Sequence, residues 1–243
     1  MKDNYLEGAL PSELKHMGLV NVDLSRNQLT GSVPTFRPSI HELDLSFNMF
    51  SSLAPDAFAG MINLTHCKLS NNRLVGNIPT SIGMLVACIH VDLSHNYLAS
   101  IPSQLGLVGS GLGPQGLSTL LLHDNHIAGS IPHQVFNRRV DVLDVSNNRL
   151  SGRLPSEVGL LRNAKTLNLA NNRLSGSVPC ELGLARATRV DISENRFQGK
   201  LPKKVSALGR SANARATLVF DTLVYDHADF RNLDLVPKGH DTF

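Results

Sequence analysis

The sequence predicts an α/β repeat fold, a right-handed solenoid with a parallel β-sheet on its concave side and short helical, 3₁₀ or irregular segments on its convex side. Three observations predict it. An asparagine recurs about every 24 residues, apolar residues alternate just before it, and a Gly-x-apolar-Pro motif follows it. A fixed period of this length is typical of solenoids, because each repeat buries its apolar side only by stacking on its neighbours.

The recurring asparagine defines about nine repeats, of which the first is incomplete. It stands at Asn4, Asn27, Asn48, Asn72, Asn96, Asn125, Asn148, Asn172 and Asn195. An amide side chain both donates and accepts hydrogen bonds, so a buried asparagine can satisfy backbone groups of neighbouring turns that would otherwise stay unpaired. We therefore expect a ladder of asparagines along the solenoid.

The residues before each asparagine have the pattern of a short strand. In the second repeat, apolar Val22 and Leu24 alternate with Asn21, Asp23 and Ser25. Such alternation places one set of side chains inside and the other set outside. We expect Val22 and Leu24 in the core, and the three polar residues on the concave surface.

The return segment of each repeat begins at the Gly-x-apolar-Pro motif, as in residues 152–155. Glycine permits the turn and proline fixes φ. The residues after the proline, as in 155–161, are expected to form a helical or 3₁₀ turn. Residues 52–55 and 99–102 depart from the motif, so we expect distorted turns there.

The combined pattern, LxxLxLxxNxLxGxIPxxLGxL, resembles the plant-type leucine-rich repeat found in receptor-kinase ectodomains, in polygalacturonase-inhibiting proteins and in some protist proteins. The resemblance covers residues 1–209, which we predict to be one leucine-rich-repeat solenoid. The paired-cysteine caps of these relatives are missing, because Cys67, Cys88 and Cys180 are widely spaced. The period is lost in residues 210–243, which are predicted to form a C-terminal cap, with a strand from Thr217 to Tyr225, and a tail.

The fifth repeat is the longest, because residues 105–116 add a glycine-rich segment. This segment follows no predicted strand, precedes no clear helix and contains no lysine, which argues against a phosphate-binding loop. We expect a flexible loop that bulges from the convex side, and a docking element is the alternative. The tail, residues 226–243, is either an ordered tail that belongs to the cap or a partner-docking extension.

Composition excludes several classes of function. The net charge is only +3, from 23 basic and 20 acidic residues, which is too little to hold nucleic acid or an anionic membrane by charge alone. No apolar run of about 18 residues is present, so we expect no membrane insertion. With no signal-like start, one glycosylation sequon at Asn63 and no paired cysteines, the compartment stays open, with a lean towards the intracellular side.

Outward positions on successive strands form rows up the concave face, since neighbouring strands lie roughly 4.8 Å apart. Glu42, His66 and His90 share one row and should be adjacent. Such a cluster could hold a transition metal, act as a pH-sensitive contact or be ordinary exposed surface. In the next row, aspartates such as Asp23 and Asp44 recur, either as a signature of the repeat or as a binding surface.

The position just before the asparagine carries Phe47, His95 and Asp124 in three of the repeats. An exposed aromatic on a concave surface is a candidate binding anchor, because it buries a large area with little loss of entropy. The alternative is that Phe47 is a partly covered edge residue beside Met49 and Phe50.

The position just after the asparagine carries Arg149, Arg173 and Arg196 in three consecutive repeats. Guanidinium groups pair well with carboxylates, so this basic stripe favours a partner with an acidic segment. The alternative is that Asn-Asn-Arg-Leu is only a habit of the repeat.

No nucleophile with a base, paired carboxylates in a cleft or metal site with a second shell is recognisable, so we expect no catalysis, no cofactor and no resident metal. Cys67 and Cys88 occupy apolar framework positions and should be buried. We predict a protein-protein recognition module that binds a protein partner through its concave face. Its predicted contact residues are Phe47, Glu42, His66, His90, His95, Asp124, Arg149, Arg173 and Arg196.

Two alternatives remain open at this point. The chain could be a structural subunit built into a large multiprotein complex, with the convex loop and the tail as permanent contacts. It could also be a fragment of a receptor ectodomain that senses a peptide or a polysaccharide.

Overall fold

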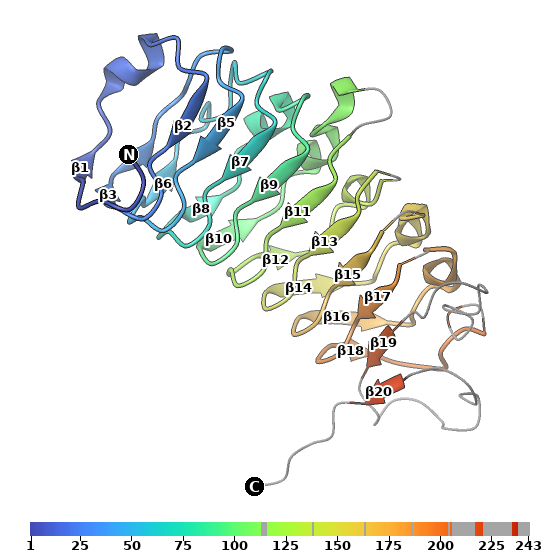
Figure 1. Ribbon diagram of the computed structural model, residues 1–243. Coiled ribbons are helices and arrows are strands. Elements are labelled where there is room, and N and C mark those ends of the chain that lie inside the picture. Colours follow the sequence, from blue (N-terminus) through green and yellow to red (C-terminus); the bar gives the residue numbers. More distant parts are fainter. Residues whose placement is uncertain are drawn as a thin grey trace, which may run out of the picture. The chain divides into compact units, whose positions relative to one another are not determined.

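The computed structural model describes residues 1–112, 116–137, 139–162, 164–185, 187–203, 205, 217–220 and 235–237. These residues form two compact units, Met1–Ile127 and Ala128–Phe243. In each unit the chain coils once per repeat, with one strand of a parallel sheet on one side of every coil (Figure 1). The predicted solenoid is confirmed, whereas the predicted boundary between residues 209 and 210 stays a prediction.

The first unit has a parallel sheet of five short strands, and each strand comes from a different repeat. In spatial order they are β2 (Asn21–Asp23), β5 (Glu42–Asp44), β7 (His66–Lys68), β9 (His90–Asp92) and β11 (Thr119–Leu121). The middle residue of each strand is buried and its two neighbours face outward, at least in part. Equivalent residues of successive repeats are paired, so the predicted rows exist.

The second unit has a parallel sheet built in the same way. Its strands are β13 (Val142–Asp144), β15 (Thr166–Asn168), β17 (Arg189–Asp191), β19 (Thr217–Phe220) and β20 (Leu235–Pro237). Strand β19 pairs with β17 in parallel, so the strand predicted from Thr217 is confirmed as far as Phe220. Most of the predicted cap and tail lies outside the described residues. We call these two sets of strands the concave strands.

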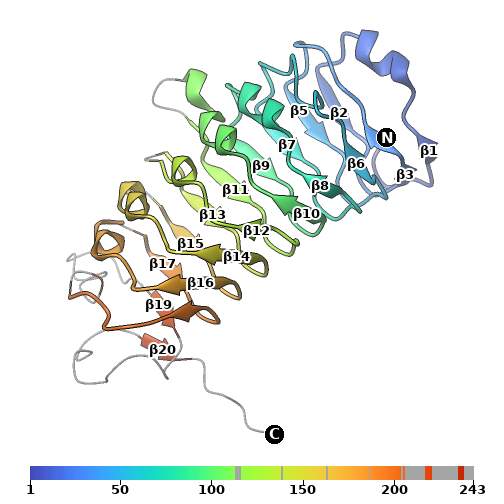
Figure 2. The ribbon, with the colours of Figure 1, turned by 180° about the vertical axis from the view of Figure 1, so that it is seen from behind.

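A second set of short strands follows the framework asparagines, on the far side of each turn (Figure 2). In the first unit, β1 (Glu7–Ala9) pairs with β3 (Gln28–Thr30), β4 (Ser32–Val33) with β6 (Ser52–Leu53), and β8 (Val75–Asn77) with β10 (Tyr97–Ser100). In the second unit, one sheet contains β12 (Ala128–Gly129), β14 (Arg149–Gly152), β16 (Arg173–Gly176) and β18 (Arg196–Phe197). Their two to four residues are too few for a recognisable apolar period, so we did not predict them.

Most of the described return segments carry the expected 3₁₀ helices, whereas residues 34–41 of the second repeat and 54–65 of the third contain none. These helices are η1 (Ser12–His16), η2 (Thr80–Met84), η3 (Ser103–Leu107), η4 (Ser110–Leu112), η5 (His133–Val135), η6 (Ser156–Leu160) and η7 (Cys180–Leu184). All except η4 begin directly after a proline in an extended conformation. No helix of the described residues is long and apolar enough to span a membrane.

The two irregular repeats deviate in different ways. In the fifth repeat the pairing of β10 with β8 shifts register between Leu98 and Ser100, which confirms the expected distortion. In the third repeat β6 pairs regularly with β4, so the strand part of that expectation is wrong. The deviation comes later, since turns replace the 3₁₀ helix in residues 55–60.

The described part of the glycine-rich segment is held against the preceding repeat. The backbone N–H groups of Gly109 and Gly111 donate hydrogen bonds to the carbonyls of Leu85 and Val86, at 3.0 and 2.9 Å. Gly109 has a φ of +72°, and a Cβ there would lie 2.3 Å from the backbone nitrogen of Leu117. Up to Leu112 the segment therefore consists of 3₁₀ turns bonded to the preceding repeat, its flexibility stays a prediction, and residues 113–115 lie outside the described part.

The asparagine ladder is confirmed for the seven interior asparagines, which are buried. The Nδ2 of Asn72 lies within hydrogen-bond distance of three carbonyls, one in the preceding repeat and two in its own, at 3.0 to 3.3 Å. Its Oδ1 accepts a hydrogen bond from the backbone N–H of Phe50 at 3.0 Å. The terminal Asn4 is exposed and Asn195 is half-buried. The amides of Asn27, Asn48, Asn72, Asn96, Asn125 and Asn172 thus each connect two successive coils around an aliphatic core.

Candidate binding surface

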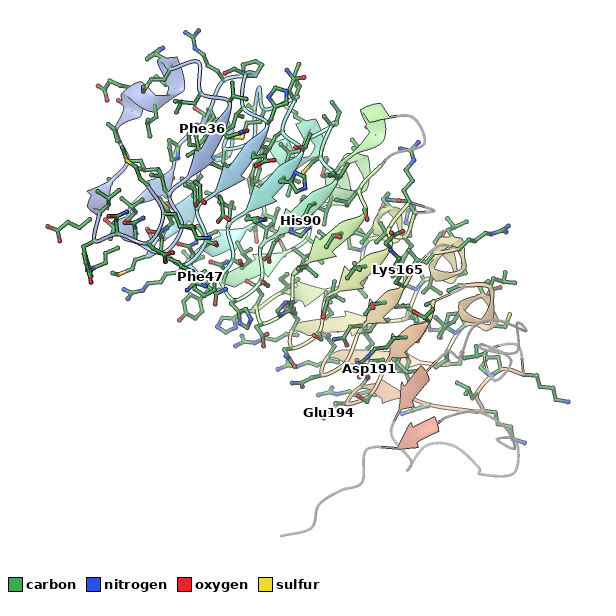
Figure 3. All side chains as sticks on the ribbon, viewed as in Figure 1. Phe36, Phe47, His90, Lys165, Asp191 and Glu194 are labelled. Atoms are coloured by element: carbon green, nitrogen blue, oxygen red, sulfur yellow. The ribbon has the colours of Figure 1, made fainter. Side chains whose placement is uncertain are left out.

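The predicted cluster on the concave strands of the first unit is confirmed. Glu42, His66 and His90 are register partners on β5, β7 and β9. The rings of His66 and His90 stack with centroids 5.9 Å apart and an interplanar angle of 28°. Figure 3 shows His90 on the concave strands. The row exposes a carboxylate and two imidazoles side by side.

An open hollow of about 260 Å³ lies over the first three concave strands. It is lined by Asn21, Val22, Asp23, Glu42, Leu43, Asp44, His66 and Lys68. Lys68 forms an ion pair with Asp44, with Nζ 3.8 Å from Oδ2. Carboxylates outnumber amines in this hollow, so its charge suits a polar or basic segment of a partner.

The aspartates of the second row are held by the framework. The Ser25 hydroxyl donates a hydrogen bond to Asp23 Oδ1 at 2.6 Å, and the Ser25 backbone N–H donates to the same oxygen at 3.1 Å. Burial by itself would raise the pKa of Asp23, but these hydrogen bonds and the nearby Lys2 and N-terminal charges lower it. The same Asp–Ser contacts recur at Asp44 and Asp92, which supports the interpretation of this row as a signature of the repeat.

The outward position predicted for Ser25 is wrong, because its side chain is only 2% exposed. Strand β2 ends at Asp23, so the alternation of the strand does not continue to Ser25.

The surroundings of His90 alter its titration. Burial lowers its pKa below the ordinary value of 6.5, and Lys68 and His66 act in the same direction. Asp92 and Asp44 oppose this effect by favouring the charged ring. The neutral form of the His90 ring is therefore favoured.

The residue before each framework asparagine adopts a left-handed backbone, a feature that we did not predict. We call this the turn-edge position. It has φ between 52° and 57° at Asp3, Arg26, Phe47, Asn71, His95, Asp124, Asn147, Asn171 and Glu194. L-residues other than Asn and Asp avoid this conformation. The frequency of Asn and Asp at this position was the signal in the sequence.

Phe47 is the least suited of these residues to a left-handed backbone, and its side chain stays 44% exposed. The Arg26 guanidinium lies over its ring, 4.6 Å from the centroid. Arg26 also lies 3.7 Å from a carboxylate oxygen of Asp3. Figure 3 shows Phe47 beyond the ends of the concave strands. The ring is therefore partly covered on one face by Arg26.

His95 and Asp124 occupy the turn-edge position in adjacent repeats, and the structure adds His123 to them. The Nδ1 of His123 lies 2.8 Å from Oδ2 of Asp124, and the Nδ1 of His95 lies 3.5 Å from the same oxygen. The two imidazole rings meet edge to face with centroids 4.9 Å apart. Reading each row separately missed His123, because it lies in the row next to the turn edge.

The three arginines are not on the concave strands. Arg149, Arg173 and Arg196 are exposed and begin β14, β16 and β18, which belong to the second set of strands. Their predicted placement on the concave face is wrong, because the residue after the framework asparagine already starts the next strand. A binding role for them stays a prediction.

Both framework cysteines are buried, as expected. Burial raises the pKa of Cys88 to about 12 and raises that of Cys67 well above its ordinary range. A buried thiol that resists ionisation is a poor nucleophile.

Two family models match the chain, and both are described as leucine-rich repeat. The first matches residues 38–98, and the second matches residues 139–161 and 163–184. The chain is a leucine-rich-repeat protein. Its predicted resemblance to the plant type is also confirmed by the relatives below.

Among curated relatives of this leucine-rich-repeat protein, human lumican is 31% identical over 154 residues, which are 62% of the chain and 42% of lumican. "Receptor-like protein 32" of Arabidopsis thaliana is 33% identical over 139 residues, which are 54% of the chain and 15% of that protein. A solved structure titled "Plant peptide hormone receptor RGFR1 in complex with RGF2" superposes with a TM-score of 0.75 and 30% identity, over 96% of the chain and 41% of the receptor chain. The chain thus spans less than half the length of each of these proteins.

Proposed function

We propose that this leucine-rich-repeat chain is a non-catalytic recognition module that binds a peptide segment of a protein partner across the hollow and the turn edge of its first unit. One observation carries the proposal. The bulky Phe47 occupies a left-handed position that favours Asn or Asp, and it remains exposed three residues after Asp44, which lines the hollow.

The backbone conformation of Phe47 is unfavourable for stability. A left-handed conformation costs an ordinary L-residue roughly 1–2 kcal/mol. The ring gains little packing in exchange, since it is exposed and its recorded ring contact is the Arg26 guanidinium. Strained residues that persist at an exposed position are typical of functional sites, and an aromatic side chain is a common binding anchor.

The chemistry of the first unit favours a particular kind of segment. Phe47 offers an apolar contact three residues after Asp44, which lines the hollow. Glu42 and Asp44 offer carboxylates on β5, while His66 and His90 offer imidazoles on the next two strands, β7 and β9. An extended peptide with one apolar side chain and a nearby basic or amide side chain fits this order of groups. RGFR1, which shares the fold, is titled as a complex with RGF2, and this supports a peptide as the ligand.

The other predictions about partners rest on different surfaces. Arg149, Arg173 and Arg196 support an acidic partner segment at the second set of strands. The relatives named as receptors favour the receptor-ectodomain alternative over a structural subunit of a large complex. The lean towards an intracellular location remains a prediction from sequence.

Selection of peptides tests the proposal without a known partner. A random-peptide phage library is panned on the wild-type chain and counter-selected on Phe47→Asn. We expect enriched peptides whose Kd rises about 30-fold in the variant, since loss of an anchor residue costs about 2 kcal/mol. The matched control is Glu194→Asn, which makes the same type of change at the turn-edge position of the second unit and should leave Kd unchanged. Equal binding to all three chains would contradict the proposal.

A further inference from the structure

The fold brings two imidazoles to one carboxylate at the turn edge of the first unit. The donor atoms of His95, His123 and Asp124 all lie within 4.8 Å of one another. The carboxylate oxygen of Asp124 lies between the two Nδ1 atoms, at 2.8 Å from His123 and 3.5 Å from His95. All three residues belong to the first unit.

The backbone fixes this arrangement across two repeats. The N–H of His95 donates a hydrogen bond to the carbonyl of His123 at 3.0 Å, and the N–H of Asn96 donates to the carbonyl of Asp124 at 3.1 Å. His95 and Asp124 both have the left-handed backbone of the turn edge, with φ of 52° and 55°. These backbone hydrogen bonds therefore join two successive coils at the point where the three side chains meet.

The donor set suits a transition metal better than calcium or magnesium. Zinc binds imidazole nitrogen at about 2.0–2.1 Å and carboxylate oxygen at about 2.0–2.2 Å, usually in tetrahedral geometry. Neighbouring donors of such a tetrahedron lie roughly 3.3 Å apart, and the two separations at Asp124 bracket this value. Calcium and magnesium prefer sets of oxygen ligands.

The exposure of the side chains leaves room for a fourth ligand. His123 is 23% exposed, Asp124 is 36% exposed and His95 is 48% exposed. The cluster is therefore partly sheltered by its own repeats and open on one side. Three protein ligands with one open position is the arrangement of zinc sites that accept water or an external donor.

We propose that His95, His123 and Asp124 form a transition-metal site that takes Zn²⁺, with the fourth position open to water or to a donor atom of a partner. The bound ion replaces the proton that otherwise joins Asp124 to an imidazole. It also connects two coils of the first unit, so it should stabilise the folded chain. The site is independent of Phe47 and of the peptide-binding proposal.

Calorimetric titration with ZnCl₂ on the full chain tests the site. We expect binding of one equivalent to the wild type, and a rise in Kd of about 100-fold in His123→Gln, because even loss of an outer-sphere partner costs about 10–100-fold. The matched control, His66→Gln, removes an imidazole from the concave row and should leave Kd within about twofold. Circular dichroism of each variant verifies its fold.

A second measurement separates a metal site from a simple hydrogen-bonded cluster. Added Co²⁺ should give the visible absorption bands of tetrahedral coordination in the wild type and in His66→Gln, and these bands should be absent in His123→Gln. Equal zinc affinity in wild type and His123→Gln would overturn the proposal. Loss of binding only in His66→Gln would also overturn it, because the ion would then belong to the concave row.

Discussion

The turn edges of the two units have the same backbone and different side chains. In the second unit the position is Asn147, Asn171 and Glu194, so two of its three residues suit a left-handed conformation. In the first unit, Arg26, Phe47 and His95 interrupt the Asn and Asp residues, yet φ hardly differs. The conformation is therefore imposed by the buried ladder and not by the residue that adopts it. Among the departures, Phe47 is the exposed aromatic, and we expect a role for its side chain itself.

The largest loss of unfolding free energy should come from substitutions in the asparagine ladder, which is present in each unit. Asn72 and Asn172 each contact three carbonyls and accept one backbone N–H, with nearly equal distances. Replacing either by alanine leaves several buried polar groups without partners, so each variant should lose about 4 kcal/mol of unfolding free energy. Denaturant titration measures it.

The control for the ladder is Asn77→Ala. Asn77 is exposed and accepts one hydrogen bond, from the Ser100 hydroxyl at 2.7 Å. Its loss should change the unfolding free energy by about 0.5 kcal/mol or less. If Asn72→Ala cost no more than this control, the ladder would not be what imposes the turn-edge conformation.

A reciprocal exchange at the turn edge should have an intermediate effect. Asn171→Phe places a bulky residue in the left-handed conformation and should lower the unfolding free energy by roughly 1–2 kcal/mol. Phe47→Asn should raise it by less, because the Arg26 contact, worth about 0.5–1 kcal/mol at an exposed site, is lost. Thermal unfolding of both variants against wild type measures the pair. If Asn171→Phe left the unfolding free energy unchanged, backbone strain would no longer support a binding role for Phe47.

The smallest expected effect is a change in the pH dependence of the unfolding free energy, caused by His90 of the first unit. Since the folded pKa of His90 is below 6.5, the unfolded chain binds more protons as the pH falls below that value. Stability contributed by the neutral ring is complete above pH 6.5 and is lost as pH falls through the folded pKa. His90→Gln should therefore reduce the loss of unfolding free energy between pH 7.5 and pH 5.5, as measured by denaturant titration at both values.

The titration of His90 also depends on the charged groups around it, which are Asp92, Lys68, His66 and Asp44. The matched control is His133→Gln on η5, an exposed histidine of the second unit, which should retain the wild-type slope. A slope in His90→Gln as steep as that of wild type would show that other groups determine the pH dependence.

The repeat period in the sequence was enough to predict the coils, the rows on the concave strands and the start of the 3₁₀ helices. The framework asparagine sets the length of each coil, and strand alternation sets the row of Glu42, His66 and His90, so their adjacency was predictable. Proline fixed the start of the convex 3₁₀ helices for the same local reason.

Only the tertiary structure decided what happens after each strand ends. There the alternation stops, so the sequence pattern no longer tells where a side chain points. The burial of Ser25, the left-handed backbone of Phe47, the displacement of Arg149 to a second set of strands and the meeting of His123 with Asp124 all occur in that turn. Hydrogen bonds between successive coils, from the backbone and from the asparagine ladder, set its geometry, and they depend on the neighbouring repeat.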